Sequence, residues 1–199
     1  MIEKVQDLSF RADFFLESYL RLRSVLTEEI ADPVKRLEFH NLPLWNFAML
    51  NANLYFFETI SCVASMLRDN QINPTKNEIL FHGLGGGLPA TTKASFQAKL
   101  NLAFGKYKSS GLKEMRDTYV DHKNLNSSGD PSAAFINLIR QDLVDSCTRL
   151  LQDLNRLFEK LLSDRTTNNY FSDFYSPEVN EYIQFVSERL QTFNVPRTT

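Results

Sequence analysis

The spacing of apolar residues along the chain predicts a protein built from helices. Apolar side chains recur at intervals of three and four over residues 5–26, 45–68, 96–120, 143–161 and 179–193. Because an α-helix turns once every ~3.6 residues, this interval places them on one side of each helix. No segment shows the alternation of apolar and polar residues that marks a half-buried strand. We therefore predict an all-α fold, with residues 1–199 forming a single bundle of about five or six helices.

Polar and glycine-containing segments divide these helices. The longest irregular segment covers about residues 70–91, and a second loop covers about residues 124–132. The triplet Ser109-Ser110-Gly111 interrupts the apolar pattern, which resumes at Leu112. A break between two helices is therefore expected at this triplet.

Two helix starts are indicated by capping residues. Thr91 or Thr92 is the candidate N-cap of the helix that carries Phe96. Ser176 followed by Pro177 fits an N-cap with proline at the first helical position. The last helix is therefore expected to begin at this pair.

The second predicted helix, residues 45–68, is apolar on several sides. A helix of this kind lies at the centre of a bundle or in the interface of an oligomer. Cys62 lies in this helix and Cys147 in a later apolar run. Two cysteines in apolar runs make a poor disulfide framework and too small a zinc ligand set, so we expect buried free thiols.

Charge and composition narrow the classes of function. The net charge of −2 argues against bulk binding of nucleic acid by a uniformly basic surface. Residues 93–123 nevertheless contain seven basic and three acidic side chains, so one segment is locally basic. The chain lacks a secretory signal pattern and a run of roughly 18 apolar residues that could span a bilayer. We expect a cytoplasmic, soluble protein that does not enter a membrane.

Candidate chemistry gathers in residues 112–124, at the end of a predicted helix within this basic segment. His40 and His82 fall in predicted loops, where a packing or connector role is the simpler interpretation. The glycine-rich segment 82–89 lacks the Lys-Ser/Thr of a phosphate loop, and no Gly-x-Ser-x-Gly nucleophile elbow accompanies it. No metal-binding spacing is present either, so neither a metal nor a cofactor is expected. Arg116 and His122 remain as the candidates.

Arg116 and His122 together supply the minimum for cleavage of RNA without a metal. The guanidinium fork suits a phosphate, and imidazole carries a proton near neutral pH. Six residues of helix give about 9 Å of rise and about 120° of rotation, so the two side chains do not share a face. A working site would therefore need a two-fold partner or an unwound last turn.

The stretch Arg116-Asp-Thr-Tyr-Val-Asp-His122-Lys-Asn resembles the Arg-x(4–6)-His motif of HEPN domains, in which a polar residue commonly follows the Arg. The order of long helices around it is also similar to this family, including its abortive-infection branch. The resemblance implies a dimeric helical bundle. It also implies a metal-independent endoribonuclease of the toxin–antitoxin or phage-defence type, with RNA as substrate and an antitoxin protein as a further partner.

Carried over by position, the resemblance gives each residue a role. Arg116 would stabilise the transition-state phosphate, His122 would act as acid or base, and Asp117 would orient Arg116. From position alone we add Tyr119 and Lys123 as substrate contacts. Asp121 departs from the small residue that the family often has, and its carboxylate could raise the pKa of His122 or repel phosphate.

Two other interpretations stay open. In the first, Arg116 and Asp117 form an ordinary helix salt bridge and His122 caps the helix. In the second, the chain is a catalytically silent HEPN-type module that binds RNA, a nucleotide or a partner protein.

Overall fold

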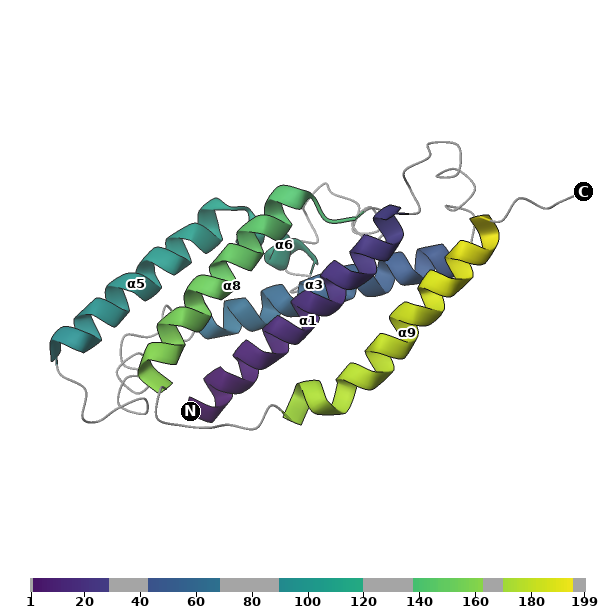
Figure 1. Cartoon of the computed structure of the whole chain (residues 1–199). Coiled ribbons are helices and arrows are strands. Elements are labelled where there is room, and N and C mark those ends of the chain that lie inside the picture. Colours follow the sequence, from purple (N-terminus) through teal and green to yellow (C-terminus); the bar gives the residue numbers. More distant parts are fainter. Residues whose placement is uncertain (1, 29–42, 69–89, 120–137, 163–169, 195–199) are drawn as a thin grey trace, which may run out of the picture.

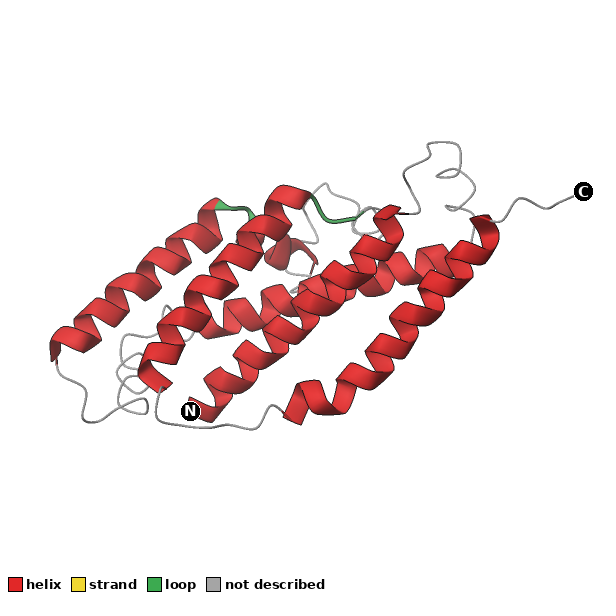
Figure 2. Cartoon of the chain, in the orientation of Figure 1, coloured by secondary structure: helices red, strands yellow, loops and turns green. Residues whose placement is uncertain are grey.

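The computed structural model describes residues 2–28, 43–68, 90–119, 138–162 and 170–194. Within these ranges the chain forms helices and contains no strand (Figures 1 and 2). The helices are α1 (Ile2–Glu28), α3 (Pro43–Arg68), α5 (Ala90–Ser109), α6 (Leu112–Tyr119), α8 (Gln141–Leu162) and α9 (Tyr170–Asn194). The predicted all-α class is confirmed.

α1 and α3 form the centre of the fold. They pack along each other, and α9 and α8 lie against α1 (Figure 1). Tyr19 of α1 and Phe56 of α3 are fully buried and their ring centroids lie 5.0 Å apart. The apolar residues of α3 are buried on several sides, as its sequence predicts, because this helix also contacts α5, α6 and α9.

α5, α6 and α8 form the other part of the bundle. α5 packs on α8, and the rings of Phe96 and Phe158 join the two helices with centroids 5.7 Å apart. The short helix α6 contacts α3, α5 and α8. The helix that carries Arg116 is therefore wedged between three others.

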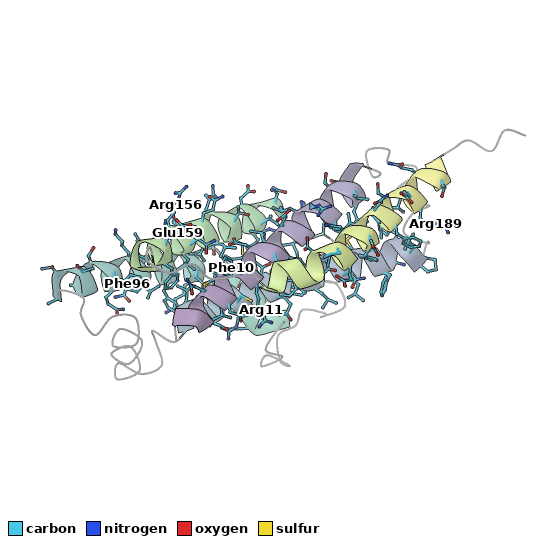
Figure 3. The ribbon with its side chains drawn as sticks, turned by 60° about the horizontal axis from the view of Figure 1, so that its bottom comes forward. Phe10, Arg11, Phe96, Arg156, Glu159 and Arg189 are labelled. Carbon is cyan, nitrogen blue, oxygen red and sulfur yellow. The ribbon has the colours of Figure 1, made fainter. Side chains whose placement is uncertain are left out.

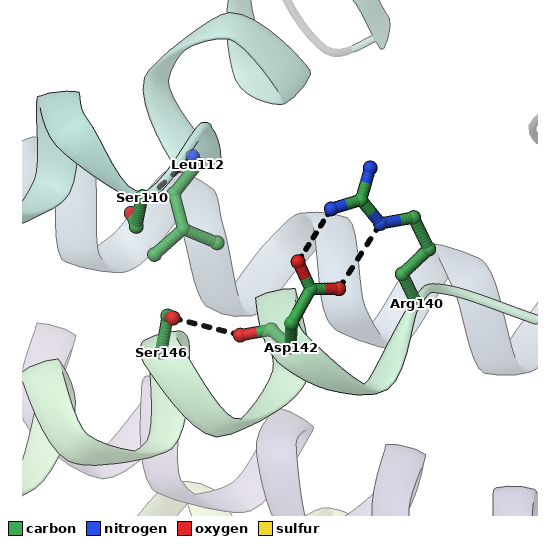
Figure 4. Close-up of polar contacts among 5 residues, drawn as sticks. All are labelled: Ser110, Leu112, Arg140, Asp142 and Ser146. Carbon is green, nitrogen blue, oxygen red and sulfur yellow. Dashed lines mark hydrogen bonds and ion pairs between the residues drawn. The ribbon is translucent and has the colours of Figure 1, made fainter.

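The segment before α8 is fastened to α1 by one arginine. Arg23 Nη1 donates to the carbonyl oxygen of Ile139 at 2.5 Å and to the hydroxyl of Tyr19 at 2.6 Å. At the N-terminus of α8, Arg140 pairs with Asp142 through two hydrogen bonds, one of them 3.0 Å long (Figure 4). The hydrogen bond from Arg140 lowers the pKa of Asp142, which keeps a negative charge in the first turn of the helix.

Both cysteines are free and buried, as predicted. Burial raises the pKa of the Cys62 thiol to about 11 and that of the Cys147 thiol to about 12. Because the thiolate is the reactive form, both side chains behave as small apolar groups at neutral pH.

Two predicted helix starts differ from the structure. α5 begins at Ala90, so Thr91 and Thr92 lie inside its first turn rather than at its cap. A shift of one or two residues is the usual uncertainty of a boundary read from capping residues.

The predicted start of the last helix at Ser176 is wrong. α9 begins at Tyr170, and Pro177 lies within it. Asn180 donates to the Ser176 hydroxyl at 3.4 Å, a contact one turn along the helix rather than a cap. At the first helical position proline would remove no backbone hydrogen bond, whereas inside α9 Pro177 removes one, so the Ser-Pro pair alone does not fix where the helix begins. Tertiary packing of the later residues Ile183, Val186 and Leu190 fixes the helix whatever its first turns contain.

The break between α5 and α6 occurs at the predicted triplet. Gly111 adopts a φ of +85°, a left-handed conformation that side chains with a Cβ rarely adopt. The backbone N–H of Ser110 closes α5 on the Lys106 carbonyl at 3.0 Å, and Met115 N–H opens α6 on the Gly111 carbonyl at 2.9 Å. The chain can therefore turn between the two helices within two residues.

Two glycines of this region give opposite expected results when changed to alanine. Gly105 lies in α5 with open space where a Cβ would stand, so Gly105→Ala should stabilise the protein by about 0.5–1 kcal/mol. Gly111→Ala should destabilise it by about 1 kcal/mol or more, because its φ is positive. Urea unfolding followed by circular dichroism measures both. Equal changes in the two variants would contradict the conformational argument.

Candidate functional site

Arg116 points into the bundle from α6. Its side chain is only 7% exposed, whereas the neighbouring Asp117 is 24% and Lys113 42% exposed. The residue is buried where α6 meets α3, α5 and α8. A cation held inside a helical bundle has to be paired to offset its loss of hydration.

Asp117 supplies part of that pairing. Its Oδ1 atom lies 3.1 Å from Nη2 of Arg116, and its Oδ2 atom contacts Nζ of Lys113 one turn earlier on the same helix. One carboxylate therefore bridges a buried arginine and a surface lysine. This geometry restrains the guanidinium, as expected for a residue that orients Arg116.

The same contact is also expected if Arg116 and Asp117 form an ordinary helix salt bridge with no catalytic role. A salt bridge between Arg116 and Asp117 is what an ordinary helical ion pair would show, so the pair agrees with both hypotheses. The burial of Arg116 is the new information. Arg116 follows Leu112 by four residues and precedes Tyr119 by three, so helical spacing places it on the apolar side of α6, in agreement with its burial.

Local backbone contacts fix where α6 starts. The Leu112 N–H faces the Ser110 hydroxyl at 3.5 Å, and that hydroxyl donates to the Tyr107 carbonyl at 3.1 Å (Figure 4). Leu112 is fully buried and Gly111 lies against Leu143 of α8. These contacts set the rotation of α6, and thereby the direction in which Arg116 points.

The second half of the predicted motif lies outside the described residues. His122, Lys123 and Asp121 follow the last residue of α6, and the loop at about 124–132 lies there too. Tyr119 is the last residue of α6, and its backbone alone is described. His40, His82 and the glycine-rich segment 82–89 also fall outside the described ranges.

The fold separates the cations of the basic segment, residues 93–123, into two places. Lys113 and Arg116 meet at Asp117 on α6, while Lys99 and Lys106 face a groove between α5 and α8. Arg156 of α8 lines the same groove. No pattern in the sequence connects Arg156 with lysines some fifty residues earlier, so this grouping emerges only from the packing of the helices.

Asp13 on α1 has a pKa raised close to neutrality. Asn155 of α8 donates to both of its carboxylate oxygens, at 2.8 and 3.0 Å, and accepts from Ser9 at 2.5 Å. Partial burial, with smaller contributions from Glu159 and Glu17, raises the pKa of Asp13 from 3.8 to about 6, although the bonds from Asn155 oppose the shift.

This raised pKa makes a pH-dependent stability expected. The folded state holds the Asp13 proton more tightly than the unfolded chain does. The resulting stabilisation of the folded state is complete below pH 3.8 and is lost as the pH rises through about 6. Asp13→Asn should remove this loss and add at most about 1 kcal/mol at pH 7, since solvent screens the partly exposed carboxylate. Thermal unfolding between pH 4 and pH 7 measures the effect. Glu159→Gln should move the loss to lower pH, because removing one repelling negative charge lowers the pKa of Asp13, while burial, the larger cause, still keeps it raised.

Metal-binding clusters and membrane-spanning helices are both absent from the described part of the chain. Over the residues that the structure describes, no group of three His, Cys, Asp or Glu side chains is arranged to hold a metal ion. Among the described helices, none is both long and apolar enough to cross a membrane.

Comparison with known proteins gives no relative. No protein-family model, curated protein or solved structure matches the chain.

Proposed function

We propose that the protein is a metal-independent endoribonuclease of the toxin–antitoxin or phage-defence type. Arg116 and His122 would assist attack of a ribose 2′-hydroxyl on the adjacent phosphate. The proposal is supported by the spacing of Arg116 and His122 together with the Arg116–Asp117 pair, 3.1 Å apart on a helix wedged between three others. An arginine fixed in this way is preorganised to stabilise charge that develops on a phosphate.

The proposed chemistry divides between the two residues. His122 would remove the proton from the 2′-hydroxyl or supply one to the leaving 5′-oxygen, because imidazole titrates near neutral pH. Arg116 would balance the extra negative charge on the phosphorane. Asp117 would keep the guanidinium oriented, and Tyr119 and Lys123 would contact the RNA. The products would carry a 2′,3′-cyclic phosphate and a 5′-hydroxyl.

A second copy of the chain belongs to this proposal. The described surface has large exposed apolar side chains on α3 and α9, with Phe47 55%, Leu54 43% and Phe185 47% exposed. The Phe47 ring packs edge-on against Tyr182 of α9, which joins the two helices into one surface. Exposed apolar surface of this kind supports association. Light scattering on the wild type and on Phe47→Ser tests it, and a monomeric wild type would count against a shared site.

The experiment for the activity uses purified protein with a chelator. We expect the wild type to cleave a single-stranded RNA in EDTA, and His122→Ala to lower the rate by about 10²–10⁴-fold. An RNA whose scissile ribose is 2′-deoxy should resist cleavage, because the attacking group is gone. Cleavage of the 2′-deoxy substrate, or full activity of His122→Ala, would show the mechanism to be wrong.

The burial of Arg116 favours one alternative. Only 7% of the Arg116 side chain is exposed, which suits a guanidinium that holds α6 in place in a catalytically silent module. Such a module would bind RNA, a nucleotide or a partner protein without cleaving RNA. Wild-type protein that binds RNA in EDTA and leaves it intact would favour this alternative.

A further inference from the structure

A groove of about 260 Å³ runs between α5 and α8. The two helices are antiparallel, because Phe96 meets Phe158 while Lys106 meets Asp153. The groove is lined by three cations, one carboxylate and apolar side chains, namely Lys99, Lys106, Arg156, Asp153, Leu102 and Leu157. Arg116 is not among the residues that line it, so the groove is separate from the candidate catalytic residue.

The groove lies beside a helix of one charge sign. α5 contains four lysines and no acidic residue in its 20 positions. In the groove itself Asp153 pairs with Lys106 at 2.7 Å, which leaves an excess of positive charge. Glu159 follows Arg156 one turn later on α8 (Figure 3), but it does not line the groove. The surface therefore attracts an anionic ligand.

An exposed leucine stands in the middle of these cations. Leu102 is 63% exposed, more than any other large apolar side chain that the structure describes as exposed. Lys99 lies three residues before it and Lys106 four residues after it, so all three share one face of α5. An apolar centre with a charged rim is the usual composition of a protein-binding surface.

We propose that this groove docks an acidic amphipathic helix of another protein. An apolar residue of the partner would cover Leu102 and Leu157, and carboxylates would pair with Lys99, Lys106 and Arg156. Lys99 and Lys106 stand two helical turns apart, about 10.5 Å, which matches acidic residues seven positions apart on a helix lying along α5. The inference does not depend on RNA cleavage.

The lining favours a protein over RNA. Surfaces that bind single strands combine cations with exposed aromatic rings on which bases stack. None of the aromatic residues of α5 lines the groove: Phe96 and Tyr107 are buried in the core, and Phe104 packs partly buried against it. Leu102 offers no stacking face, and the Asp153 carboxylate would repel a phosphate placed beside Lys106.

The test uses a labelled helical peptide of about 21 residues with leucine at the first and fourth heptad positions and glutamate at the flanking positions. A matched peptide carries lysine in place of glutamate. By fluorescence anisotropy the acidic peptide should bind at least about tenfold more tightly than the basic one. Lys99→Glu/Arg156→Glu and Leu102→Ala should each weaken binding by about tenfold or more.

Two control variants and one competing ligand make the result decisive. Arg189→Glu on α9, which Figure 3 shows far from Arg156, and Leu20→Ala on α1 should leave peptide binding unchanged. Equal binding of both peptides, or binding that survives the groove variants, would overturn the proposal. A single-stranded RNA of about 12 nucleotides that binds more tightly than the acidic peptide, and is lost in the same variants, would also overturn it in favour of RNA.

Discussion

If the proposed activity is correct, Arg116→Lys should lower the rate of RNA cleavage by about 10²–10³-fold while the protein remains folded. Lysine keeps the positive charge beside Asp117 but lacks the two-pronged guanidinium. The transition state is therefore less stabilised, which lowers the cleavage rate. Asp117 keeps its contact with Lys113, and the carboxylate is therefore not left alone in the variant. Initial rates on a labelled RNA in EDTA, together with urea midpoints, separate the loss of activity from a loss of stability.

Lys113→Met is the matched control for this result. It removes the other cation that contacts Asp117, but from a side chain that is 42% exposed. An exposed helical ion pair contributes about 0.3–0.5 kcal/mol, so stability and cleavage should both stay near the wild type. Wild-type cleavage by Arg116→Lys, or an equal loss in Lys113→Met, would remove the special role given to Arg116.

Leu22→Ala should cost about 2–5 kcal/mol of stability. Leu22 is fully buried on α1, the helix that contacts α3, α8 and α9. Removing its side chain leaves a cavity where these helices meet, and the rigid neighbours cannot close it completely. Equilibrium unfolding in urea measures the change.

Leu20→Ala provides the comparison on the same helix. Leu20 is 38% exposed and lies only two residues away, so the change in helix propensity is the same while the loss of burial is smaller. We expect a cost below about 1 kcal/mol. Similar costs for both variants would mean that α1 does not pack as described.

Helix periodicity is sufficient to predict this fold class. The apolar spacing on α1, α3 and α8 is regular because each presents a face to the core, and these helices appear where the sequence predicts them. Boundaries set by single residues are less secure. Gly111 marks a true break because its φ is positive, whereas Pro177 marks no start because packing of the later residues of α9 outweighs the backbone hydrogen bond that proline removes.

The site is predicted less completely than the fold. Residue types suggest the pairing of Arg116 with Asp117, but the burial of the guanidinium depends on how α6 rotates between α3, α5 and α8. The groove between α5 and α8 is invisible in the sequence, since Lys99 and Arg156 approach only when the helices pack. Roles for His122 and Lys123 stay predictions.

The packing of α9 on α1 has a consequence for synthesis on the ribosome. Arg21 of α1 contacts Asn180 of α9, a partner 159 positions later in the chain. The apolar stripe of α1 therefore leaves the exit tunnel long before the helix that covers one of its sides. Until then it is exposed to chaperones and to neighbouring nascent chains, a condition that promotes aggregation. Slow translation between α8 and α9 should lengthen that interval and lower the yield of folded protein.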